Sequence, residues 1–111
     1  MALTELCKTK HIPAGGLREF SVGGKGILVA HVDSRFYCLD PRCTHAGAPL
    51  VKGVLKNHEL ECPWHDGAFR IADGSVLYGP PKMPLQTYQC LVRGESLFVD
   101  LSPSGKLGEV Q

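Results

Sequence analysis

The sequence has no hydrophobic run long enough to cross a membrane. Its longest clearly apolar run, Gly26 to Ala30, is far shorter than the roughly 20 residues that a membrane-spanning helix needs. The N-terminal residues MALTELCKTK also lack the apolar stretch of a secretory signal. We therefore expect a cytoplasmic protein that has no membrane partner.

An excess of charge of either sign is also absent. The formal net charge is +1, and the lysines and arginines are scattered singly along the chain, so we expect no nucleic-acid partner. No repeat, low-complexity tract or linker divides the 111 residues, and this length is typical of one domain. We expect a single domain over residues 1–111 and a monomer.

A disulfide framework is a poor interpretation of the cysteines. There are five, an odd number at irregular spacing, and no secretion signal accompanies them. Metal or redox chemistry explains them better. Three of the five have no histidine neighbour and lie in strand-like segments, where we expect burial as small apolar residues: Cys7, Cys38 and Cys90.

Short hydrophobic segments separated by turn residues predict an all-β fold, a small barrel or sandwich of antiparallel strands. Turns at Gly23-Gly24 and Asp33-Ser34 predict that the first three strands form a meander. The residues Ile12-Pro13-Ala14 predict the one helical turn. The expected strands are Leu17–Val22, Gly26–Val32, Arg35–Leu39, His58–Cys62, Ala68–Ile71, Gln86–Val92 and Ser96–Leu101.

Two short loops each carry one cysteine and one histidine. CTHAG begins at Cys43 and contains His45, and CPWHDG begins at Cys62 and contains His65; sixteen residues separate His45 from Cys62. Two thiolates and two imidazoles suit zinc or an iron-sulfur centre. Structural zinc sites usually pair cysteine with cysteine and histidine with histidine at short spacing, whereas each loop here mixes the two types. A zinc-binding interaction module nevertheless stays an alternative.

A mixed pair in each loop fits a two-iron cluster in which one iron takes both thiolates and the other takes both imidazoles, the Rieske ligand pattern. CTHAG and CPWHDGAF resemble the two cluster-binding boxes of the Rieske family, over a likeness from about Leu3 to Leu101. The resemblance implies stacked antiparallel sheets with a cluster-binding part at one tip, about residues 40–84. It also implies one 2Fe-2S cluster, with Cys43 and Cys62 on the inner iron and His45 and His65 on the outer iron.

Other positions indicate which branch of the Rieske family the chain resembles. Gly79-Pro80-Pro81 is similar to the family's proline loop, which covers the cluster from a third side. Members from cytochrome bc complexes bridge their boxes with two further cysteines, where this chain has Ala48 and Trp64. Their serine and tyrosine hydroxyls near the cluster are replaced by Gly67 and Phe69. Loss of donors to sulfur predicts a potential near the low end of the Rieske range.

In these respects the chain resembles the ferredoxins that serve aromatic-ring and related oxygenases. It has no room for a mononuclear iron site with a substrate cavity, and Gly23 to Gly26 lie in a hairpin rather than in a dinucleotide fingerprint. The remaining histidines, His11, His31 and His58, lie far apart, and we expect surface or local roles for them. The chain is thus expected to carry electrons rather than to be an enzyme.

Its partners would be a flavin- or nicotinamide-linked reductase and an oxygenase or another acceptor. A small Rieske subunit of a larger oxidoreductase, such as a nitrite reductase, is the alternative. For Trp64, packing beneath its loop and contact with a docking partner both stay open.

Overall fold

The computed structural model describes residues 3–44, 47–64, 67–79 and 81–102, and these residues form an all-β fold, as predicted. Short 3-10 turns lie at Thr9–His11 and Leu50–Lys52. Within these ranges, no helix is long and apolar enough to cross a membrane. The strands are β1 Leu3–Lys8, β2 Leu17–Val22, β3 Lys25–Val32, β4 Arg35–Leu39, β5 Val54–Lys56, β6 Glu59–Glu61, β7 Ala68–Arg70, β8 Val76–Tyr78, β9 Thr87–Tyr88, β10 Cys90–Arg93 and β11 Ser96–Asp100.

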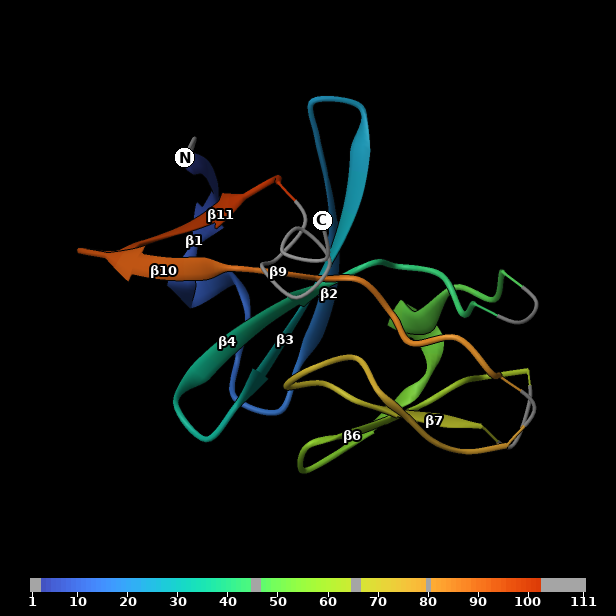
Figure 1. Ribbon diagram of the computed structural model, residues 1–111. Helices are drawn as coiled ribbons and strands as arrows, with labels where there is room; N and C mark the ends of the chain where they lie inside the picture. The colour runs from blue at the N-terminus through green and yellow to red at the C-terminus, as the bar shows by residue number, and fades with distance from the viewer. Residues whose placement is uncertain (1–2, 45–46, 65–66, 80, 103–111) are drawn as a thin grey trace.

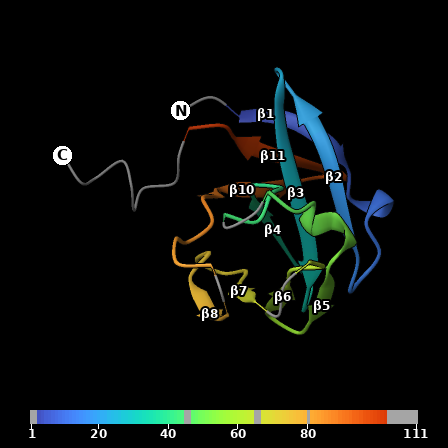
Figure 2. The ribbon, with the colours of Figure 1, turned by 90° about the vertical axis from the view of Figure 1, so that its right-hand side faces the viewer.

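The strands make three antiparallel sheets, ordered β1-β11-β10, β2-β3-β4-β9 and β5-β6-β7-β8. Figures 1 and 2 show the first sheet at one end of the molecule and the third at the other. Strand β3 is covered on both faces: Leu28 and Ala30 belong to the core shared with the third sheet, and Ile27 and Val29 to the core shared with the first. This double burial explains why Gly26 to Ala30 read as a continuous apolar run.

The predicted meander is confirmed as β2, β3 and β4. The β2–β3 turn places Gly23 and Gly24 at φ 57° and 81°, and the β3–β4 turn places Asp33 and Ser34 at φ 54° and 65°. Two successive residues in the left-handed region are the signature of tight hairpin turns whose twist matches the flanking strands. The turn residues therefore set the register of the middle sheet.

Two predictions about local structure are wrong. The segment Gln86–Val92 is not one strand, because Thr87–Tyr88 pairs with β4 whereas Cys90–Arg93 pairs with β11. The chain passes from the middle sheet to the first sheet between these two pairings. The single helical turn predicted at Ile12–Ala14 is also wrong: the 3-10 turns lie at Thr9–His11 and Leu50–Lys52, and Ile12 has an extended backbone and a side chain buried in the core.

The third sheet supports the loops that carry the cysteine-histidine pairs. In β6 and the residue that follows it, Leu60 and Cys62 are buried, whereas Glu59 is exposed and Glu61 is half-buried. The alternation predicted from the sequence is therefore confirmed. Because of this alternation, the side chain of Cys62 lies on the core side of its loop.

Candidate metal centre

The first loop, residues 43–48, is closed on itself by its main chain. The Cys43 amide donates to the Ala48 carbonyl over 2.9 Å, and the Gly47 amide donates to the Cys43 carbonyl over 2.8 Å. Gly47 lies at φ 74°, a conformation that glycine adopts without steric cost. The closed loop holds the Cys43 side chain in the core with an exposed fraction of 2%. The predicted ligand His45 lies outside the described residues.

The second loop, residues 62–67, is closed in the same way. It connects β6 to β7, and the Cys62 amide donates to the Gly67 carbonyl over 2.9 Å. The Cys62 side chain has an exposed fraction of 5%. His65, the other predicted imidazole ligand, lies outside the described residues.

The fold brings the two predicted thiolate ligands into one core. Cys43 and Cys62 belong to the same buried cluster, packed with Phe69 and Leu60, and neither is in a disulfide. Two buried thiols at the starts of two loops fit the inner iron of a two-iron cluster, because thiolate is the usual ligand of iron-sulfur centres. The described residues alone contain no group of three His, Cys, Asp or Glu that could hold a metal, so the predicted site depends on His45 and His65.

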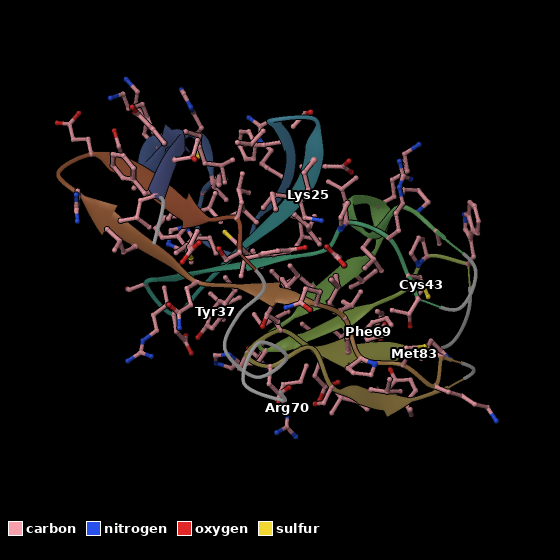
Figure 3. All side chains as sticks on the ribbon, turned by 45° about the horizontal axis from the view of Figure 1, so that its top comes forward. Lys25, Tyr37, Cys43, Phe69, Arg70 and Met83 are labelled. Carbon is pink, nitrogen blue, oxygen red and sulfur yellow. The ribbon has the colours of Figure 1, made fainter. Side chains whose placement is uncertain are left out.

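A third segment, residues 79–84, lies beside both loops. The Thr44 hydroxyl donates to the Met83 carbonyl over 2.7 Å. Gly67 is buried against Pro81: a Cβ atom there would lie 2.6 Å from Pro81 Cδ. Figure 3 shows Cys43, Phe69 and Met83 on the same side of the molecule. Pro81 of the predicted proline loop thus lies against the second loop, whereas Pro80 lies outside the described residues.

Sequence reasoning missed Thr44 as the link between the first loop and this segment. In the sequence, the only indication of this role is that Thr44 carries a hydroxyl and stands between the predicted ligands Cys43 and His45. The structure also gives Gly67 a role beyond the missing hydroxyl, because close packing against Pro81 leaves no room for a side chain. A serine at this position would therefore move Pro81 as well as add a donor.

The surface around the loops is apolar and basic. Trp64 and Met83 have exposed fractions of 60% and 66%, so packing of Trp64 beneath its loop is wrong. Arg42, Lys52 and Lys82 are all exposed. The docking role of Trp64 stays a prediction.

The other histidines have surface or local roles, as predicted. His31 Nδ1 lies 2.7 Å from the Ile12 carbonyl oxygen, and His58 Nε2 lies 3.0 Å from an Asp33 carboxylate oxygen. His11 is exposed. Among the non-ligand cysteines, burial is confirmed for Cys38, whereas Cys7 and Cys90 are only half-buried at the edge of the same core.

Comparison with known proteins supports the same centre. Residues 2–89 match the family model of the Rieske 2Fe-2S domain. The ferredoxin component of the naphthalene 1,2-dioxygenase system of Pseudomonas aeruginosa is 34% identical over 82% of this chain and 88% of its own length. Apoptosis-inducing factor 3 of Homo sapiens is 34% identical over 87% of this chain, but the chain spans only 16% of that protein.

A solved complex of reduced oxygenase and oxidized ferredoxin in carbazole 1,9a-dioxygenase has the same fold. Its matching chain has a TM-score of 0.81 and 30% identity, covering 87% of this chain and 91% of that one. The matched lengths include both cysteine-histidine loops of this sequence. The chain therefore belongs to the Rieske 2Fe-2S domain family, and its cofactor is a Rieske-type 2Fe-2S cluster.

Proposed function

We propose that this protein carries single electrons on its Rieske cluster from a flavin- or nicotinamide-linked reductase to a terminal oxygenase. The observation that carries the proposal is the pair of buried, unbridged thiols, Cys43 and Cys62, each held at the start of a loop that its own main chain closes. Bound there, a two-iron cluster supplies one-electron chemistry without a substrate cavity.

The proposed ligands are Cys43 and Cys62 on the inner iron and His45 and His65 on the outer iron. Each histidine follows its cysteine within a closed loop, so one loop can reach both irons. Burial of the thiolates excludes water from the sulfur side. The proposed cluster-binding part is residues 40–84 of a single domain, residues 1–111.

The similarity to ferredoxins of dioxygenase systems supports an oxygenase as the partner. One relative is named as a ferredoxin component of a dioxygenase system, and a solved neighbour is a ferredoxin in complex with its oxygenase. The chain has no dinucleotide fingerprint to accept electrons from a nicotinamide directly. We therefore propose a separate reductase, a monomeric carrier and a cytoplasmic location.

A Rieske unit within a larger oxidoreductase is the second candidate. It is favoured by the match to apoptosis-inducing factor 3, in which the chain corresponds to 16% of the protein. Gel filtration of the holoprotein with a candidate partner separates the two cases. A carrier elutes alone at its own size, whereas a permanent subunit co-elutes with its partner.

Replacement of the histidines tests the ligand set. His45→Ala and His65→Ala should each abolish the red-brown visible spectrum of the reconstituted protein, because one iron then lacks a protein ligand. His58→Ala is the matched control, since His58 contacts Asp33 instead, and its spectrum should be unchanged. A normal spectrum in either ligand variant, or a colourless wild-type protein that binds zinc, would refute the assignment.

A further inference from the structure

A row of side chains crosses the third sheet at the base of the second loop. The register pairs Val54 with Glu61, Glu61 with Ala68 and Ala68 with Tyr78, so these four residues follow one line across β5 to β8 (Figure 2). Glu61 directly precedes the second loop and Ala68 directly follows it. The row therefore lies next to the proposed ligand Cys62.

Glu61 lies on the outer face of this sheet with a fixed main chain. Its neighbour Leu60 is fully buried, so the alternation of the strand turns Glu61 away from the core. Its backbone is paired with strands on both sides. A Cβ atom at Gly53 would collide with the Glu61 carbonyl oxygen, so close packing also limits movement there. The side chain of Glu61 therefore starts from a well-defined position beside Cys62.

Two other side chains hold the carboxylate of Glu61. The Tyr78 hydroxyl donates to Glu61 Oε2 over 3.1 Å, and Lys56 Nζ lies 3.3 Å from the same oxygen. Tyr78 and Glu61 are two strands apart, so the tyrosine side chain spans β7 to reach the carboxylate. Ala68, which lies between them in the register, has an exposed fraction of 0%. The carboxylate is therefore held against the sheet at the base of the loop.

The charges around Glu61 do not cancel. Its side chain has an exposed fraction of 30%, whereas that of Lys56 is exposed at 62%. Solvent screens an exposed charge more than a half-buried one, so the carboxylate acts on its surroundings more strongly than the ammonium group beside it. The Tyr78 hydroxyl is a neutral donor and leaves the charge in place. A negative charge therefore stays close to Cys62.

We propose that Glu61 helps to set the reduction potential of the metal centre, with Tyr78 as the positioning residue that holds its carboxylate. The inference rests on the proposed function, in which the thiolate of Cys62 belongs to a one-electron centre. Reduction adds one negative charge there, and a carboxylate held nearby destabilises the reduced state by Coulomb repulsion. Glu61 therefore lowers the potential, and Lys56 opposes this effect in part.

Replacement of the carboxylate by a neutral amide of the same size tests the charge. At a fixed potential near the wild-type midpoint, Glu61→Gln should raise the ratio of reduced to oxidised holoprotein about threefold, which is about 30 mV for a one-electron couple. Glu59→Gln is the matched control. It makes the same change of net charge on the same face of β6, but at an exposed position further from Cys62. Its ratio should change much less, as measured by voltammetry.

Two further variants separate charge from packing. Lys56→Gln removes the opposing positive charge, so the ratio should fall, in the direction opposite to that of Glu61→Gln. Disturbance of the sheet alone would move both variants in the same direction. Tyr78→Phe removes the donor that holds the carboxylate, and solvent then screens the charge more strongly. Glu61→Gln should therefore change the ratio less when it is added to Tyr78→Phe than when it is made alone.

The visible spectrum separates failure of this inference from failure of the proposed function. A wild-type protein that stays colourless after reconstitution would refute both. A normal spectrum with equal midpoints for Glu61→Gln and the wild type would overturn the role of Glu61 alone. An undiminished shift in the Tyr78→Phe background would overturn the positioning role of Tyr78. If Glu61→Gln does not fold, a Lys56→Gln ratio equal to or above that of the wild type would overturn the inference.

Discussion

The hydroxyl of Thr44 donates a hydrogen bond of 2.7 Å to the main-chain carbonyl of Met83, across 39 residues of sequence. It joins the first cysteine-histidine loop to the segment that carries Pro81. Gly67 of the second loop packs against the same Pro81. The proline segment therefore contacts both loops, through this hydrogen bond to the first loop and through the packing of Pro81 on the second.

Loss of this hydrogen bond should loosen the metal centre. Thr44→Val removes the donor but keeps the shape of the side chain, and it should cost about 1 kcal/mol of unfolding free energy, as a single hydrogen bond typically contributes. We expect the visible spectrum to bleach faster in denaturant. Thr44→Ser retains the hydroxyl and is the control. Equal bleaching of the valine variant and the wild type would mean that the hydrogen bond does not support the loops.

The reduction potential should lie near the low end of the Rieske range of roughly −150 to +300 mV. Neither Gly67 nor Phe69 offers a hydroxyl that could stabilise the reduced cluster. Phe69→Tyr is the better test, because a side chain at position 67 would collide with Pro81. Phe69 is fully buried in the core that holds both cysteines.

A new hydrogen bond worth about 1 kcal/mol more to the reduced state should raise the midpoint by about 40 mV in voltammetry of Phe69→Tyr. Phe69→Leu, which adds no donor, is the control for changes in packing. If the wild-type protein already titrates near the positive end of the range, the missing hydroxyls do not set its potential.

Electron transfer should occur at the tip formed by residues 43–50, 62–67 and 79–84. Trp64 is the largest exposed apolar side chain there. Trp64→Ala should reduce turnover with the physiological partner about 5- to 30-fold, as loss of a central aromatic contact typically does, while the spectrum and midpoint stay unchanged. Val92→Ala is the matched control, since Val92 is also exposed but lies on β10 at the other end.

The same tip should attract an acidic partner surface. Arg42, Lys52 and Lys82 are exposed around it, so association should slow as salt rises, because solvent ions screen such charges. Charge reversal at Lys52 and Lys82 should slow association and flatten the salt dependence in stopped-flow measurements. If neither charge reversal at Lys52 and Lys82 nor Trp64→Ala changes turnover with the partner, the docking face lies elsewhere.

Stability should decline at alkaline pH through Tyr88. Burial raises the pKa of Tyr88, and so does the Asp40 carboxylate to which its hydroxyl donates over 2.6 Å. Because the folded-state pKa exceeds the unfolded value of about 10, this contribution is complete below pH 10 and is lost as pH rises towards the folded value. Denaturation with urea should show a shallower alkaline decline in Tyr88→Phe. Parallel curves would contradict the role of Tyr88.

The sequence alone determined the features that depend on neighbouring residues. The mixed cysteine-histidine pairs predicted the type of cofactor, because ligand chemistry is a property of the side chains themselves. Gly23-Gly24 and Asp33-Ser34 predicted the hairpins, because the backbone conformation of a tight turn is selected by its own residues.

Only the tertiary structure decided which distant segments meet. It split the predicted strand Gln86–Val92 between two sheets, placed Thr44 against Met83 and gathered Cys7, Cys38 and Cys90 in one core. A strand pattern shows which face of a segment is apolar but not which sheet covers it. That choice depends on the packing of three sheets around two cores, which involves residues far apart in the chain.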